Sequence, residues 1–178
     1  VGGVASALFM KDAVRKAHNT VYTWGYDADF NKIYLEKFVQ FDPFTTGQFF
    51  FSVEELVSVA DLLSHEEHRE SLFFNEWVLP QGWTDAISAT LEKSATAYSA
   101  FSVIRHERNG IVDDETRRRM KLIVPHIRRA VAIGKIIDLR SVKAAALADT
   151  LDGLSAAIVL VDDDNRIVHA NAAGHAML

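Results

Sequence analysis

An aromatic-rich segment that ends at a Pro-Gln-Gly turn constrains the fold of this chain more than any other feature. Phe73, Phe74 and Trp77 lie close enough in sequence to share one side of a helix, and the turn that begins at Pro80 ends that helix. An alternating apolar and polar run over residues 86–92 follows and predicts a half-buried strand. The sequence therefore predicts a helix that places large rings against a sheet.

The composition excludes several classes of protein. The 178 residues are 49% hydrophobic and 24% charged, typical of a globular chain long enough for one domain and part of another. The net charge of -5 argues against a nucleic-acid-binding surface, because phosphate contacts need clustered positive charge. The absence of cysteine excludes disulfides and thiol nucleophiles. No apolar run could cross a bilayer and no signal peptide is present, so we expect a cytoplasmic protein with no membrane partner.

The first part of the chain predicts two strands and a helix. Val4 to Met10 and Thr20 to Trp24 are apolar or β-branched runs, and the polar segment from Lys11 to Asn19 between them predicts a loop joining antiparallel strands. Asp27 is an N-cap for a helix that runs to about Phe41. One face of this helix carries rings at four-residue spacing, and Asp42-Pro43 ends it. These rings belong to Tyr26, Phe30, Tyr34 and Phe38.

The middle of the chain predicts the rest of a sheet. Residues 49–51 form either a short buried strand or a loop anchor, and an amphipathic turn follows from Ser52 through Ala60. Ser64 and Glu67 form a capping box that begins the aromatic-rich helix. Strands over residues 85–93 and 97–105 follow. The predicted fold class is α/β (α+β), a central antiparallel sheet of at least four strands flanked by helices.

A long helical pattern runs from the N-cap Asp113 to about Leu151. Pro125 predicts a kink or a break within it. Apolar residues alternate at four- and three-residue steps, which is typical of a parallel dimer contact. We therefore expect a homodimer through the 113–151 helix. The residues of this seam are Met120, Val124, Ile127 and Val131.

The last part of the chain resembles the opening of a PAS domain. Residues 156–161 and 166–170 predict two strands joined by the polar turn 162–165, and the second ends in Asn171-Ala172-Ala173. Together with the opening residue Val1, which lies in an apolar segment, the apparent helix start at the C-terminal end leads us to expect an excerpt from a longer protein. We assign residues 1–137 to a sensor domain, 138–153 to a helical linker and 154–178 to the start of a PAS-like domain.

From about Val4 to Ile137 the chain resembles the GAF-like sensor half of LuxR-type bacterial transcription regulators. In the members that bind acyl-homoserine lactones, a helix presents aromatic residues before an Asp-Pro, and the acid accepts the ligand amide hydrogen. The resemblance implies a similarly built pocket, although Phe30 stands where those sensors usually have a hydrogen-bonding tryptophan, and it leaves the identity of the ligand open. The ligand-binding residues that the pattern and the resemblance predict together are Tyr26, Phe30, Tyr34, Asp42, Phe73, Phe74, Trp77 and Ser102.

Two charged clusters have simpler interpretations than catalysis or DNA binding. His65 and His68 are three residues apart rather than the four of a helical zinc motif, so a solvated helix start is favoured over a metal site. The basic residues within 117–129 alternate with apolar positions and predict the solvated face of the long helix. We see no catalytic constellation, no metal site and no cofactor motif, so we expect no enzyme activity here.

The sequence thus predicts a cytoplasmic small-molecule sensor domain of a LuxR-type regulator. It would signal through the dimeric helix to a C-terminal DNA-binding domain outside these residues. Two alternatives remain open: the regulatory region of a PAS-containing histidine kinase or cyclic-dinucleotide enzyme, and a ligand-free dimerisation module.

Overall fold

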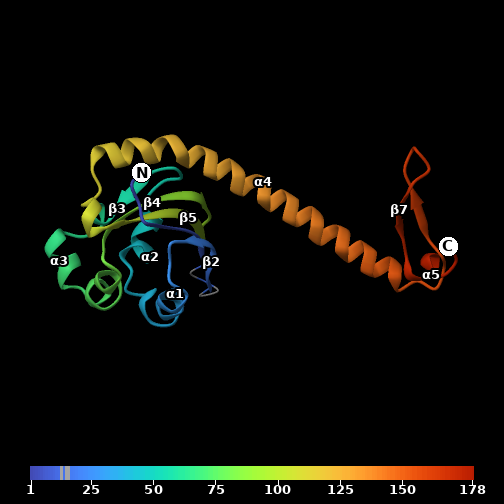
Figure 1. The fold of residues 1–178 in the computed structure, drawn as a ribbon, viewed down its shortest axis with the longest axis horizontal. Helices are drawn as coiled ribbons and strands as arrows, with labels where there is room; N and C mark the ends of the chain where they lie inside the picture. The colour runs from blue at the N-terminus through green and yellow to red at the C-terminus, as the bar shows by residue number, and fades with distance from the viewer. Residues whose placement is uncertain (13, 15–16) are drawn as a thin grey trace. The chain divides into compact units, whose positions relative to one another are not determined.

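The sheet at the centre of the fold contains five antiparallel strands in the order β2-β1-β5-β4-β3, as the computed structural model in Figure 1 shows. The structure describes residues 1–12, 14 and 17–178. Both predicted strand pairs are confirmed. The strands are β1 (Ala5–Asp12), β2 (Ala17–Trp24), β3 (Leu56–Ser58), β4 (Trp83–Lys93) and β5 (Ala97–His106).

The predicted loop between the first two strands begins too early. Lys11 pairs with Tyr98 of β5 and lies inside β1, where it shares a face with Ala7 and Phe9. It is buried, although the sequence pattern placed it in a solvated loop. The described part of that loop is Val14, and residues 13, 15 and 16 lie outside the described residues.

The helix after β2 forms as predicted and changes its geometry halfway. Asp27 caps α1 (Ala28–Ile33) by accepting from the backbone N–H groups of Asp29 and Phe30. The helix continues as a π-helical turn, η1 (Tyr34–Phe38). Asp42 then caps α2 (Pro43–Gly47), so the Asp-Pro pair ends one helix and begins the next.

Residues 48–61 differ from the prediction. Residues 48–50 form the 3-10 turn η2 (Gln48–Phe50) rather than a buried strand, and the ring of Phe50 is exposed. The predicted amphipathic turn is instead strand β3 followed by the 3-10 turn η3 (Val59–Asp61). Residues 56–58 are a strand because they pair with β4. An edge strand of three residues has too little periodicity to be recognised from the sequence.

The aromatic-rich helix is divided into two pieces. The predicted capping box of Ser64 and Glu67 begins α3 (His65–Glu70). Ser71 is extended, and its hydroxyl donates to the His68 carbonyl and accepts from the Phe74 N–H, which ends the first piece and begins the second. The second piece contains η4 (Phe74–Val78) and η5 (Leu79–Gln81).

Gly82 allows the chain to enter β4. Its φ of 68° is left-handed, and a Cβ atom there would meet Nε2 of His106 at 2.6 Å.

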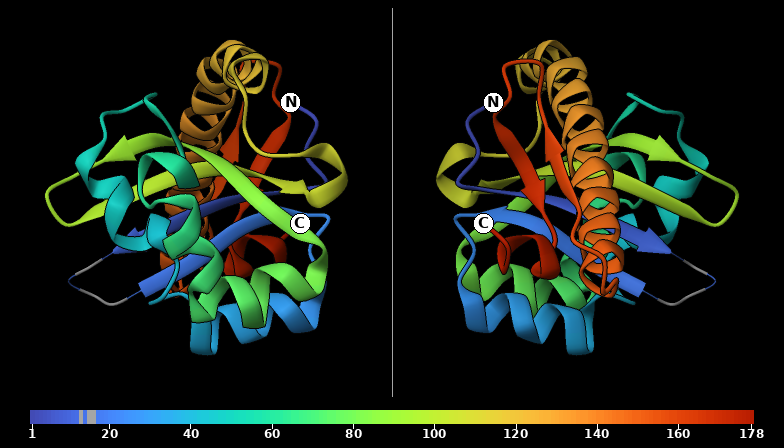
Figure 2. Two further views of the ribbon diagram at one scale, coloured as in Figure 1. Left: turned by 90° about the vertical axis from the view of Figure 1, so that its left-hand side faces the viewer. Right: turned by 90° about the vertical axis from the view of Figure 1, so that its right-hand side faces the viewer.

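Helices α1 to α3 lie on one face of the sheet and the start of α4 lies on the other (Figures 1 and 2). Most of β4 is buried because both faces of the sheet are covered, so the strand predicted to be half-buried is buried along most of its length.

The long helix α4 (Asp114–Asp152) begins at the predicted cap and contains Pro125 without a break in the helix. Met120 and Val124, two residues of the predicted dimer seam, are buried. Arg117 contacts Asp61 at 2.6 Å and Arg128 contacts Glu54 at 3.0 Å, so these side chains hold the first turns against their own domain. The prediction that Met120 and Val124 form a dimer seam is therefore wrong. Arg118 and Arg119 are exposed, as predicted.

The chain divides into two compact units, Val1–Arg129 and Ala130–Leu178, with the boundary inside α4. In the second unit, β6 (Val159–Val161) and β7 (Ile167–Ala170) form the predicted hairpin, followed by α5 (Ala172–His175). The buried amide of Asn171 joins them: it donates to the carbonyl of Ala156 at 2.8 Å and accepts from the N–H of Ile158 at 2.9 Å. Within the described residues, no helix has the length and hydropathy needed to span a membrane.

Candidate functional site

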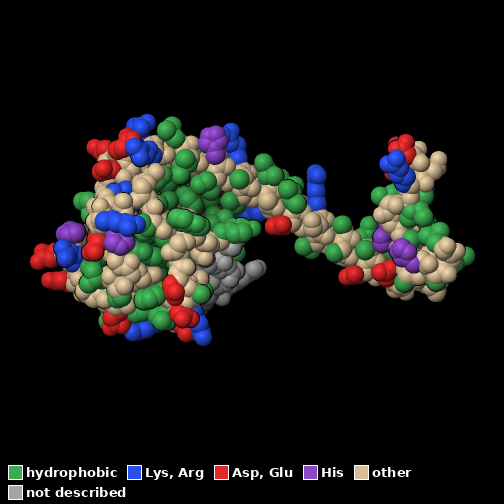
Figure 3. All heavy atoms as spheres, in the orientation of Figure 1, with side chains coloured by type: hydrophobic (Ala, Val, Ile, Leu, Met, Phe, Trp, Pro, Cys, Tyr) green, Lys and Arg blue, Asp and Glu red, His purple; other side chains and the backbone are tan. Residues whose placement is uncertain are grey.

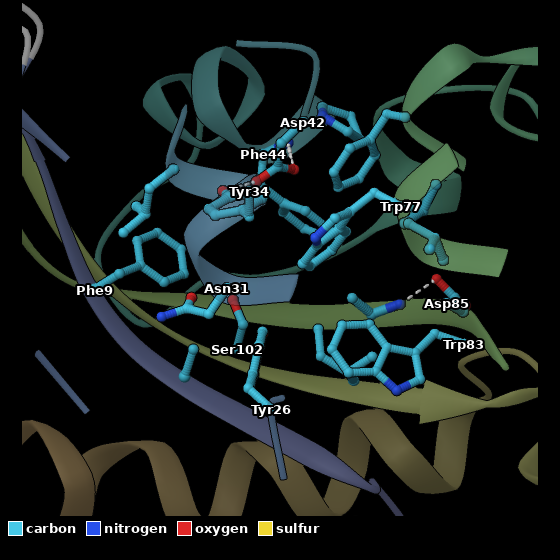
Figure 4. Close-up of a pocket in the computed structure, with 18 of the residues that line it drawn as sticks. Phe9, Tyr26, Asn31, Tyr34, Asp42, Phe44, Trp77, Trp83, Asp85 and Ser102 are labelled. Atoms are coloured by element: carbon cyan, nitrogen blue, oxygen red, sulfur yellow. Dashed lines mark hydrogen bonds between the residues drawn. The ribbon is translucent and has the colours of Figure 1, made fainter. Parts of the chain in front are cut away.

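A cavity of about 70 Å³ lies between one face of the sheet and the helices that cover it. Strands β1, β4 and β5 form its floor, and residues of α1, η1, α3 and η4 form its walls (Figure 4). The volume is well below the roughly 300 Å³ of small ligand pockets. Six predicted residues line it: Tyr26, Tyr34, Asp42, Phe73, Trp77 and Ser102.

Trp77 is the centre of the aromatic wall. Its ring stacks on Phe73 with centroids 5.2 Å apart and lies 4.9 Å from the ring of Tyr34. Trp83 meets it edge-on at 5.2 Å. The indole Nε1 donates to the carbonyl of Phe30 at 2.9 Å, which joins η4 to α1. The rings fill most of the space between the helices and the sheet, which explains why the cavity is small.

A buried ion pair closes the polar end of the cavity. Nζ of Lys11 donates to Oδ2 of Asp42 at 3.2 Å, to the Tyr34 hydroxyl at 3.1 Å and to Oγ1 of Thr45 at 2.6 Å. The Tyr34 hydroxyl donates to the same Asp42 oxygen at 2.6 Å. The other oxygen, Oδ1, accepts from the N–H of Phe44 at 2.9 Å. We call these four side chains, Lys11, Tyr34, Asp42 and Thr45, the polar cluster.

The hydrogen-bonding groups of the polar cluster are almost all paired with one another. An ammonium group has three protons, and all three on Lys11 have acceptors within the cluster. Burial raises the pKa of the Tyr34 hydroxyl well above its usual range, and the Asp42 charge adds to this effect. Burial lowers the pKa of Lys11, while Asp42 opposes that shift. The predicted acid therefore lines the cavity with Lys11 and Tyr34 already bound to it.

His68 and Asp85 are two further polar residues of the lining. The Asp85 carboxylate accepts from the backbone N–H groups of Ala86 and Val112, both at 2.7 Å. Burial lowers the pKa of His68, and the charge of Asp85 acts in the opposite direction. The imidazole packs edge-on against the ring of Phe74, with centroids 4.9 Å apart.

The structure places Phe30 and Phe74 outside the cavity lining. Phe30 is partly buried and packs against the aromatic core, while its carbonyl receives the Trp77 indole. Phe74 is buried behind the lining, beside His68. Phe73 and Phe74 are adjacent in sequence and project in directions about 100° apart, so they do not both face the cavity.

Ser102 lies on the floor of the cavity, as predicted for its strand. Its hydroxyl donates to Oγ of Ser88 on β4 at 2.9 Å. The two serines face each other across β4 and β5. Ser102 therefore enters the lining as part of a strand-to-strand contact.

Sequence reasoning missed four polar lining residues, Lys11, Asn31, His68 and Asp85. Lys11 alternates with Ala7 and Phe9, which was a usable signal for an inward position. His68 was predicted to belong to a solvated helix start, and this is wrong, since His65, Glu66 and Glu67 are exposed but His68 is buried. Among the described residues, no group of three His, Asp or Glu side chains is positioned to hold a metal ion.

Five antiparallel strands with helices enclosing a pocket on one face and a long helix on the other form an architecture of the GAF-like and PAS-like type. Solved structures that share it include the following two. The VqsR LBD domain from Pseudomonas aeruginosa has a TM-score of 0.59 and 13% identity over 71% of this chain and 74% of that chain. SdiA from Escherichia coli has a TM-score of 0.53 and 18% identity over 77% of this chain and 56% of that chain.

These likenesses establish the fold, at identities too low to establish more. No protein-family model matches the sequence, and no curated protein matches it. The predicted fold class is therefore confirmed.

Proposed function

We propose that the first unit is a small-molecule sensor domain of a LuxR-type transcription regulator. It acts in the cytoplasm without catalysing a reaction and signals through α4, as a homodimer, to a DNA-binding domain beyond these residues. The aromatic-walled cavity carries this proposal, because it lies on the sheet face that the helices cover in a fold shared with VqsR LBD and SdiA. A ligand that binds one arrangement of the aromatic helices more tightly than another would increase the population of that arrangement. The helix α4 would transmit this change.

One observation favours a second function, a dimerisation module without a ligand. The cavity is only about 70 Å³, and the polar cluster binds itself. A ligand larger than a few heavy atoms must displace aromatic side chains in order to enter. The two proposals differ in whether any compound stabilises the domain.

A ligand screen separates these proposals. The whole chain is incubated with a metabolite collection, and thermal shift and native mass spectrometry report binding. We expect at least one compound to raise the melting temperature, because a ligand that binds only the folded state stabilises it by mass action. Ala7→Leu places a larger side chain in the cavity lining and should abolish that shift.

Ala95→Leu is the matched control, because Ala95 is exposed in the turn between β4 and β5. It should leave the ligand-induced shift unchanged. If no compound raises the melting temperature of the unaltered chain, the sensor proposal is wrong and the dimerisation module takes its place.

The homodimer has its own test on the second half of α4. Several large apolar side chains there are exposed, and Figure 3 shows hydrophobic side chains along the helix. Ile133 and Ile137 share a face because they are four residues apart, and Ile136 adjoins it. We propose that this face, rather than Met120 and Val124, forms the dimer contact. Ile137→Glu should convert a dimer to a monomer in sedimentation velocity experiments.

Val142→Glu is the control for the dimer test. Val142 is also exposed, but five residues beyond Ile137 it points to nearly the opposite side of the helix. This variant should remain dimeric. A monomeric unaltered chain, or equal effects of the two variants, would contradict the proposed contact.

A further inference from the structure

His68 is a buried imidazole with an unused ring nitrogen in the wall of the cavity. The residue is 4% exposed, and its Nδ1 has no hydrogen-bond partner among the described residues. It lines the cavity together with Asp85. Most buried polar groups are hydrogen-bonded, so an unpartnered one at a cavity indicates a position where a bound molecule completes the contact.

The polar cluster offers a ligand fewer free hydrogen-bonding groups than His68 does. Every proton of the Lys11 ammonium is used, and the Tyr34 hydroxyl both accepts from Lys11 and donates to Asp42. Both oxygens of Asp42 also have donors. A ligand group that bound there would have to break an existing hydrogen bond of a buried ion pair, which is unfavourable in a low-dielectric site.

The chemistry of the ring decides what His68 can recognise. Burial lowers the pKa of His68, which favours the neutral ring with one donor nitrogen and one acceptor nitrogen. A buried N–H without an acceptor is rarer in proteins than a buried acceptor without a donor. Nδ1 is therefore better described as a free acceptor.

The charges around this part of the cavity favour a neutral ligand. Asp85 is buried, and its two oxygens already accept from the N–H groups of Ala86 and Val112. Asp42 is paired with Lys11, and the exposed His65 lies on the solvent side of α3. The rest of the cavity lining is mainly aromatic and aliphatic, as Phe73, Trp77 and Val78 illustrate.

We propose that Nδ1 of His68 accepts a hydrogen bond from the ligand, and that the ligand is a compact, neutral, largely apolar molecule with an N–H or O–H donor. This inference rests on the proposed sensor function and deepens it. It moves polar recognition from Asp42, where the resemblance to lactone sensors placed it, to α3. His68 is thus a residue that determines ligand specificity.

Pyrrole and furan test the proposal, because both are flat five-membered rings of nearly the same size and only pyrrole has an N–H donor. Their affinities for the whole chain are measured by NMR titration. We expect pyrrole to lose about fivefold in affinity relative to furan when His68 is replaced by phenylalanine, the effect of one lost hydrogen bond. His68→Gln keeps an acceptor and should retain part of the preference.

His65→Phe is the control, since the same substitution on the exposed histidine of α3 should leave the ratio of the two affinities unchanged. If His68→Phe does not fold, the ¹⁵N shift of Nδ1 in the unaltered chain gives the answer: pyrrole should move it, and furan should not. Equal behaviour of the two probes in the unaltered chain, or a preference lost in Tyr34→Phe and kept in His68→Phe, would overturn the proposal while leaving the pocket intact. Binding of neither probe to any variant would overturn this proposal, while the metabolite screen described above decides the sensor function separately.

Discussion

Replacing Lys11 with methionine is expected to lower the free energy of unfolding by about 3–5 kcal/mol, the usual cost of removing one partner of a buried ion pair. Lys11 is 3% exposed and Asp42 is 8% exposed, so water cannot replace the lost ammonium. The Asp42 carboxylate would keep only the donors from Tyr34 and Phe44. The Thr45 hydroxyl would lose its donor as well.

Urea denaturation followed by tryptophan fluorescence measures the Lys11→Met effect. Lys37→Met is the matched control, because Lys37 pairs with Glu76 at 2.6 Å but both side chains are about half exposed, at 55% and 46%. Removal of that surface pair should change the free energy of unfolding by less than about 1 kcal/mol. Equal effects of the two variants would mean that the polar cluster is solvated.

A double variant distinguishes the two sources of this cost. In Lys11→Met with Asp42→Asn, the uncompensated charge is gone. The amide oxygen can still accept from the Phe44 N–H, and the NH2 group in place of Oδ2 can donate to the Tyr34 hydroxyl oxygen. We expect the double variant to recover a large part of the stability lost in Lys11→Met, because the penalty comes from the unpaired carboxylate. The same logic makes Asp42→Ala a poor test of ligand binding, since it leaves Lys11 buried and unpaired.

The sheet and most helices could be predicted because their signals are local. Alternation identified β4, an apolar run identified β1, and a short polar turn separated β5 from β4. The caps at Asp27, Ser64 and Asp113 began helices where predicted. Strand β3 could not be predicted, since its three residues are defined by pairing with β4. The sequence also could not show whether the helix continues through Pro125, because helix continuity depends on what packs around the lost hydrogen bond.

Six of the eight predicted residues line the cavity, and the residues that were missed include four polar ones. Ring spacing brought Tyr26, Tyr34 and Trp77 to the cavity, because helix periodicity predicts which side chains share a face. The partner of Asp42 is 31 residues away on β1, so only tertiary structure shows that the acid is already neutralised. His68 stands among exposed charged residues, and local composition does not distinguish the one inward-facing position from them.

The apolar side chains of α4 are buried against the first unit in one part of the helix and exposed in another. The seam that begins at Met120 and Val124 has coiled-coil spacing, but in the first unit these residues are buried by the domain itself. An apolar stripe predicts a packing partner without identifying it. The exposed Ile133, Ile136 and Ile137 belong to a different part of the helix, which is where an external partner has room.

Replacing Trp77 with alanine is expected to reduce the free energy of unfolding by about 3–5 kcal/mol, as for other buried aromatic truncations. The side chain is 4% exposed, and four rings lie around it, at centroid distances from 4.9 Å to 6.4 Å. The carbonyl of Phe30 would also lose its indole donor. Thermal and urea denaturation measure the loss.

The cavity left by Trp77→Ala gives this prediction a second readout. Added indole should occupy the vacated space and raise the melting temperature of the variant in proportion to the logarithm of its concentration above Kd. Trp24→Ala is the control: Trp24 is 68% exposed at the end of β2, so its loss should change the free energy of unfolding by less than about 0.5 kcal/mol and should create no indole site. A Trp77→Ala variant that is destabilised but not rescued by indole would show that the surrounding rings collapse into the space. In that case the aromatic wall is deformable enough to close around a guest, and the small cavity of the unbound state sets no upper limit on ligand size.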